Sequence, residues 1–141
     1  MRLAAGLTAE QEAALEAHIA REEEAQSGPE PISIRLATEF HILMADLTGS
    51  PVLARYVNEV AYRCGLTLSQ FARPHSTVCG IQEHRDILAA LKSGDVVRAQ
   101  DIARTHLEAV SARAQFKGAE INGYSYLDAL EPYASGVRNS G

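Results

Sequence analysis

The sequence predicts an all-α protein folded as an antiparallel helical bundle. Apolar residues recur every three or four positions in five successive segments, and no segment shows the strict alternation of a half-buried strand. Short connections that contain Gly, Pro or Ser separate most of these segments, which is typical of helices that lie antiparallel to their neighbours. The chain has 141 residues, of which 46% are hydrophobic, and this length and composition suit one domain with its own core.

The first helix is predicted from Thr8 to about Ala25. Gln11 stands three residues after Thr8, and this pair matches a capping box, in which two side chains satisfy exposed backbone N–H groups. We interpret the acidic run at 22–24 as a solvated surface, and the Ser, Gly and Pro residues within 27–31 as a linker.

The second helix is predicted to follow Ser33 and to stop at Gly49, a residue type that commonly ends helices. Ser50 and Pro51 then begin a third helix as N-cap and first-turn proline, and Pro74 ends it. The apolar stripe of this third helix is predicted to face inward and consists of Leu53, Tyr56, Val57, Val60 and Cys64.

The fourth helix is predicted to start near Ser76 and to close at Gly94, and Asp95 caps the fifth. The inward face of the fifth helix is predicted to comprise Val97, Ile102, Ala103, Leu107 and Val110. We therefore expect residues 1–116 to form one helical domain. Beyond it, glycines, an Asn-Gly pair and a proline predict an irregular tail over 117–141.

The composition limits the kinds of partner. The net charge is -5, and no Lys/Arg cluster stands out, so direct contact with DNA is disfavoured. No apolar run is long enough to cross a bilayer, and the N-terminus lacks the features of a signal peptide. Cys64 and Cys79 are too few and too separated to form a disulfide framework, and we interpret them as buried thiols. We expect a cytoplasmic protein that does not bind membranes.

Three of the five histidines lie on the apolar stripes of three different predicted helices: His41, His84 and His106. A single histidine in such a place is more often a hydrogen-bonded core residue than a ligand. Three of them in one small bundle carry a desolvation cost that a shared divalent metal removes, because neutral imidazole is a common metal ligand. On spacing alone, both interpretations stay open. His18 and His75 are interpreted as surface or capping residues.

Two sequence blocks and a final histidine resemble the ligand-binding domain of FadR-type GntR transcription regulators. The blocks are Glu39-Phe40-His41 with Leu47-Thr48-Gly49-Ser50-Pro51, then Glu83-His84-Arg85-Asp86-Ile87-Leu88 with Gly94-Asp95, and the last histidine stands in Thr105-His106-Leu107. The order and spacing of these elements extend the resemblance over roughly residues 8 to 115.

The resemblance implies a helical domain that dimerises and binds a small organic acid, often through zinc or nickel. The metal ligands that it implies are His41, His84 and His106. Members that bind metal add an Asp or Asn one helical turn before the first histidine, where this chain has Ala37. Three imidazoles still suit zinc when the remaining coordination position is open, because water or an effector carboxylate can occupy it. Alternatively, the histidines hydrogen-bond an anionic ligand directly. Arg63 and Arg73 are candidate partners for its carboxylate.

Regulators of this family carry a winged helix-turn-helix ahead of the sensing domain. No such segment stands in this sequence, and the sensing domain's own first helix is missing or cut short. We therefore expect an effector-sensing and dimerisation domain that is not an enzyme and that contacts DNA only through a helix-turn-helix domain absent here. Two alternatives remain, a three-histidine metal-dependent hydrolase and a bundle kept only for dimerisation.

Overall fold

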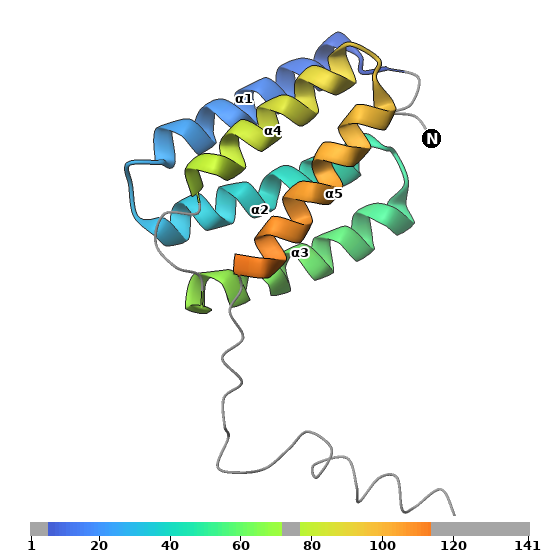
Figure 1. Cartoon of the computed structure of the whole chain (residues 1–141). Helices are drawn as coiled ribbons and strands as arrows, with labels where there is room; N and C mark the ends of the chain where they lie inside the picture. Colours follow the sequence, from blue (N-terminus) through green and yellow to red (C-terminus); the bar gives the residue numbers. More distant parts are fainter. Residues whose placement is uncertain (1–5, 72–76, 114–141) are drawn as a thin grey trace, which may run out of the picture.

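The computed structural model describes residues 6–71 and 77–113. Within these ranges the chain forms helices and no strand (Figure 1), which confirms the predicted all-α class. The helices are α1 (Ala9–Ala25), α2 (Glu30–Leu47), α3 (Pro51–Phe71), α4 (Thr77–Lys92) and α5 (Val96–Arg113). The predicted irregular tail, Pro74 and the side chain of Cys79 lie outside the described residues.

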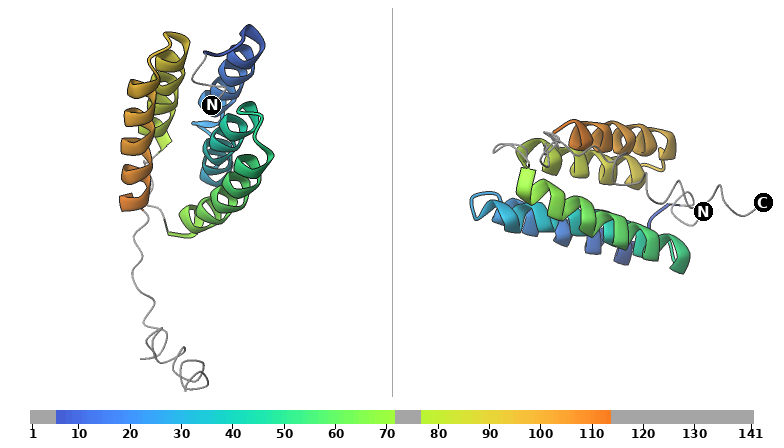
Figure 2. Two further views of the ribbon diagram at one scale, coloured as in Figure 1. Left: turned by 90° about the vertical axis from the view of Figure 1, so that its right-hand side faces the viewer. Right: turned by 90° about the horizontal axis from the view of Figure 1, so that it is seen from below.

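The five helices form two layers. Figure 2 shows α1, α2 and α3 side by side in one layer, with α4 and α5 in the other. Within the layers, α2 packs against α1 and α3, and α4 packs against α5; between the layers, α4 packs on both α1 and α2. The hydrophobic core fills the space between the layers, and its largest members are Leu15, Ile19, Phe40, Ile81, Ile87, Leu88 and Leu91.

Local capping signals fix most helix ends where they were predicted. The Thr8 hydroxyl accepts a bond from the backbone N–H of Gln11 at 3.2 Å, and the Gln11 side chain accepts one from the backbone N–H of Thr8 at 3.0 Å. Gly49 and Gly94 follow α2 and α4 with φ angles of 67° and 76°, a conformation that glycine adopts without strain. The Asp95 carboxylate accepts a bond from a backbone N–H in the first turn of α5.

The start of α2 differs from the prediction. The helix begins at Glu30, inside the expected linker, rather than after Ser33. Pro29 occupies the N-cap position and Pro31 lies in the first turn, where a backbone N–H has no helical partner and its loss costs nothing. Proline therefore starts this helix instead of excluding it.

The predicted inward stripe of α3 is instead largely exposed. Leu53, Tyr56 and Val60 are 45%, 63% and 58% exposed, and Cys64 is exposed as well, which contradicts its interpretation as a buried thiol. The reason is that α3 meets α2 through a different face. Gly65 lies so close to α2 that a Cβ atom there would stand 2.7 Å from Oγ1 of Thr38.

Two predicted inward residues of α5 are also exposed. Val97 is 71% and Leu107 is 53% exposed, whereas Ala99 and His106 are buried. The buried face of α5 is thus narrower than its apolar sequence pattern. Within the part of the chain that the structure describes, no helix is long and apolar enough to cross a membrane.

Candidate metal centre

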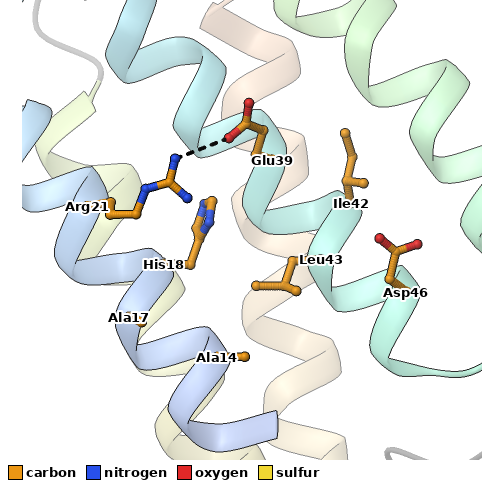
Figure 3. Close-up of a pocket in the computed structure, with 8 residues that line it drawn as sticks. All are labelled: Ala14, Ala17, His18, Arg21, Glu39, Ile42, Leu43 and Asp46. Atoms are coloured by element: carbon orange, nitrogen blue, oxygen red, sulfur yellow. Dashed lines mark ion pairs between the residues drawn. The ribbon is translucent and has the colours of Figure 1, made fainter.

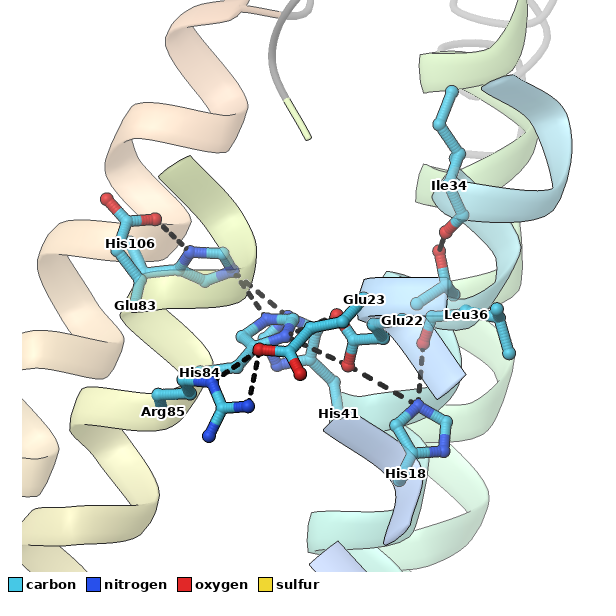
Figure 4. Close-up of polar contacts among 11 residues, drawn as sticks. His18, Glu22, Glu23, Ile34, Leu36, His41, Glu83, His84, Arg85 and His106 are labelled. Carbon is cyan, nitrogen blue, oxygen red and sulfur yellow. Dashed lines mark hydrogen bonds and ion pairs between the residues drawn. The ribbon is translucent and has the colours of Figure 1, made fainter. Parts of the chain in front are cut away.

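Three imidazole rings from three helices meet between the two layers. His41 comes from α2, His84 from α4 and His106 from α5 (Figure 4). The Nε2 atom of His106 lies 3.2 Å from Nε2 of His41 and 3.3 Å from Nε2 of His84, and the set is compact enough to surround one metal ion. His84 and His106 are buried and His41 is half-buried. The structure therefore brings together the three histidines that the sequence singled out.

The ring of His84 is clamped by an aromatic neighbour. Phe40 is fully buried, and its ring stacks on His84 with 3.9 Å between centroids and 14° between planes. Phe40 precedes His41 in α2, so the same turn of this helix presents one imidazole and orients a second.

Two carboxylates fix the proton positions of two rings. Glu22 of α1 accepts a hydrogen bond from Nδ1 of His84 at 2.9 Å, and Glu83 of α4 accepts one from Nδ1 of His106 at 2.6 Å. An ionised carboxylate only accepts, so where these carboxylates are ionised Nδ1 carries the proton in both rings. Nε2 of a neutral ring is then a bare lone pair, and both lone pairs point into the centre.

Burial favours the neutral form of two of these rings. Together with the charges of the neighbouring histidines, it lowers the pKa of His41 and of His84 from 6.5 to about 3. When all three rings are neutral, His84 and His106 have no Nε2 proton to share, so acceptors face one another in a buried space. Such a donor set suits a divalent cation. Zn–N bonds of 2.0–2.1 Å in tetrahedral geometry separate two ligand nitrogens by about 3.3–3.4 Å, close to the distances seen here.

Sequence reasoning missed the two buried polar residues of α1. Glu22 was interpreted as part of a solvated acidic run but is 2% exposed, and His18 was interpreted as a surface residue but is 6% exposed. Both belong to the helix face of Leu15 and Ile19, at spacings of three, four and seven residues, and this periodicity was the signal that could have found them. The Nε2 atom of His18 lies 2.8 Å from the carbonyl oxygen of Leu36.

The two carboxylates nearest the rings differ in their surroundings. Burial raises the pKa of Glu22 from 4.5 to about 7, and His18 opposes this shift. Glu83 precedes His84 in sequence but serves the other ring, that of His106, and 28% of its side chain is exposed. Neither role was predicted. Because each carboxylate is bonded to a ring Nδ1, each acts on the centre through a histidine.

Other candidate residues lie away from the centre. Ala37 stands one turn before His41 and brings no donor atom. The side chain of Arg63 is 77% exposed, and its Nη2 lies 2.7 Å from a carboxylate oxygen of Glu59 on the same helix. Arg73 and His75 lie outside the described residues. A role for either arginine in effector binding stays a prediction.

A groove lies on the outer side of α1 and α2, away from the three histidines. This groove has a volume of about 340 Å³ (Figure 3). An ion pair between Arg21 and Glu39, 3.9 Å apart, spans it, and His18 forms part of its lining. His18 separates the groove from Glu22, since its Nε2 lies 3.5 Å from that carboxylate.

The fold and the centre together define a helical bundle with a buried polar interior. The FCD domain family model matches residues 1–109. Because this match covers more than half of the chain, the protein belongs to the FCD family, whose members form the C-terminal domain of GntR-family regulators. Comparison with curated proteins and with solved structures found no significant match. The family assignment confirms the resemblance at the level of the GntR regulators.

Proposed function

We propose that this chain is the effector-sensing domain of a GntR-family regulator, and that it holds a divalent metal on His41, His84 and His106. The observation that carries the proposal is the convergence of three Nε2 atoms, two of which belong to rings whose Nδ1–H donates a hydrogen bond to a carboxylate, which leaves the Nε2 lone pair free. Zinc and nickel are among the divalent metals that imidazole ligands suit.

The proposed effector is a small organic acid. A divalent metal bound by three neutral imidazoles keeps a net positive charge and an open coordination position, which attracts a carboxylate oxygen. Ala37 brings no competing donor atom one turn before His41. His41 is the least buried of the three rings, so an effector has its access on that side of the centre.

The signal we propose is a shift in helix packing. The three ligands come from α2 in one layer and from α4 and α5 in the other, so an effector bound at the centre contacts both layers. A ligand shifts an equilibrium between two packings by the difference in its affinity for them. We propose that the domain acts as a dimer. The exposed apolar side chains of α3 favour this, because monomeric proteins rarely expose a contiguous apolar patch to solvent.

The metal is tested by calorimetric titration of zinc and nickel into protein stripped with a chelator. We expect the wild-type chain to bind a single ion, and the triple substitution of His41, His84 and His106 to Ala to abolish binding. Cys64→Ser is the matched control, because an exposed thiol also binds zinc. Binding that survives the triple substitution, or none in the wild type, overturns the metal site.

The effector is tested by the thermal shift of metal-loaded and metal-free protein with a panel of mono-, di- and tricarboxylic acids. We expect some acids to raise the melting temperature of the metal-loaded form alone. An equal shift without metal would support direct hydrogen bonding of the anion by the histidines. No shift with any acid in either form would support the bundle as a dimerisation unit only.

A further inference from the structure

The carboxylate of Glu22 is buried without a Lys or Arg partner among the described residues. It is 2% exposed, and within the described part of the chain its ion-pair partners are two histidines, His84 at 2.9 Å and His18 at 3.5 Å. Among the described residues, most acidic side chains that form ion pairs do so at the surface with Lys or Arg, as the neighbouring Glu23 does with Arg85. A buried carboxylate without a Lys or Arg partner is costly, so this one calls for a compensating interaction.

The geometry around His84 gives Glu22 a positioning role. Both carboxylate oxygens lie near Nδ1 of His84, at 2.9 and 3.2 Å, and Phe40 stacks against the face of the same ring. The hydrogen bond sets the direction of the ring and the stacking sets its plane. Together they aim Nε2 of His84 at Nε2 of His106, 3.3 Å away.

The charges around the centre point to the same residue. Three neutral imidazoles bring no negative charge to a divalent cation, and Ala37 brings none from α2. Glu22 and Glu83 each place a carboxylate one ring away from the Nε2 atoms. Glu83 is partly exposed and screened by solvent, whereas Glu22 is buried and acts across a low-dielectric interior.

We propose that Glu22 is the charge-balancing and positioning residue of the metal centre, holding His84 by its Nδ1–H and replacing through that ring the acidic side chain that position 37 lacks. This inference rests on the metal site proposed above. It assigns to α1, which provides none of the three ligands, a direct influence on metal affinity.

The test compares zinc affinities of Glu22→Gln and Glu23→Gln by competition with a chromophoric chelator. Gln keeps an acceptor for Nδ1–H but removes the charge, and we expect Glu22→Gln to weaken zinc binding on the order of 10- to 100-fold. Glu23→Gln removes an exposed charge from the adjacent position, and we expect its affinity to equal that of the wild type.

The two proposals fail in different ways. A wild-type chain that binds no zinc overturns both, whereas equal affinity of the wild type and Glu22→Gln overturns only the role of Glu22. Circular dichroism and the melting temperature of each variant in chelator show whether it folds. If Glu22 had only a structural role, its substitution would change that melting temperature but would not change the zinc affinity of the folded protein.

A second variant tests the charge balance itself. We expect Ala37→Asp, made in the Glu22→Gln background, to recover at least part of the lost zinc affinity, because it places a carboxylate one turn before His41 on the same helix face. The single variant Ala37→Asp is its control. No recovery in the double variant would overturn the claim that Glu22 replaces the charge missing at position 37.

Discussion

At the scale of single residues, burial shifts the pKa values of the groups in the centre in opposite directions. The pKa of His41 and of His84 falls to about 3, while the pKa of Glu22 rises to about 7. In both cases the protein interior disfavours the charged form of the side chain. The free energy of unfolding of the metal-free protein therefore depends on pH through two effects of opposite sign.

The histidines make the metal-free fold less stable in mild acid. Between pH 6.5 and about 3, His41 and His84 are protonated in the unfolded chain but stay neutral in the folded protein. The free energy of unfolding therefore falls as the pH falls. Glu22 acts in reverse, because between about 7 and 4.5 its folded form binds the extra proton. From about pH 7 to about pH 5 we estimate a loss of roughly 2 kcal/mol per histidine and an offset of roughly 2 kcal/mol from Glu22.

Urea unfolding in chelator at these two pH values measures the balance. We expect the wild type to lose about 2 kcal/mol, and Glu22→Gln, which lacks the offset, to lose about 4 kcal/mol. The same loss in both proteins would contradict a raised pKa for Glu22, and no loss in either would contradict lowered pKa values for the histidines.

The residues of the centre differ in how far the sequence could reveal them. His41, His84 and His106 were predictable because histidine on an apolar stripe is conspicuous in each helix by itself. Glu22 was not found, because its neighbours in the acidic run made it look solvated although its spacing from Leu15 placed it on the buried face. Which ring a carboxylate contacts depends on how helices distant in sequence pack.

At the scale of helices, local chemistry was a reliable guide to ends and a poor one to faces. The capping box at Thr8 and the glycines after α2 and α4 act over four or five residues, and each helix end they predicted is confirmed. Periodicity shows which residues of α3 share a face but not which face meets α2. The apolar face was expected to pack, and the contact formed instead at Gly65.

The contact between α2 and α3 has a sharp steric limit at Gly65. A Cβ atom there would lie 2.7 Å from Oγ1 and 3.4 Å from Cγ2 of Thr38, whose hydroxyl is held by a bond to the carbonyl oxygen of Ile34 at 2.8 Å. We expect Gly65→Ala to destabilise the protein by about 1–3 kcal/mol, the range for overpacking, despite the better helix propensity of Ala. Urea denaturation measures this difference.

Two further variants identify the cause of that loss. Adding Thr38→Ala removes the clashing atoms, so the double variant should lose less stability than the two single variants combined. Gly80→Ala in α4 is the control, since the nearest atom to its Cβ, in His106, lies at an ordinary contact distance of 3.9 Å. Strict additivity of Gly65→Ala and Thr38→Ala would show that the steric conflict lies elsewhere.

At the scale of the whole molecule, the two layers are joined unevenly. Salt bridges connect α4 to α1 at the surface, from Lys92 to Glu16 and from Arg85 to Glu23. For α5, the polar contact to the other layer among the described residues is the one between His106 and His41. The attachment of α5 to the first layer thus depends on the centre more than that of α4 does.

Metal removal is therefore expected to loosen α5 selectively. A ligand present at 100 times its Kd stabilises the state that binds it by about 2.7 kcal/mol, and here that state requires α5 to lie against α2. In hydrogen exchange we expect the backbone amides of α5 to be protected by zinc, while those of α3, which brings no ligand, change little.

The variant His41→Ala separates this mechanism from general stabilisation. It removes the ligand contributed by the first layer and leaves His84 and His106 on neighbouring helices of the second. Zinc should then protect α5 far less than in the wild type, even at concentrations that saturate any remaining binding. Equal protection of all helices by zinc, or full protection of α5 in this variant, would show that the centre does not hold the two layers together. In that case the route proposed here from a bound effector to helix packing would fail as well.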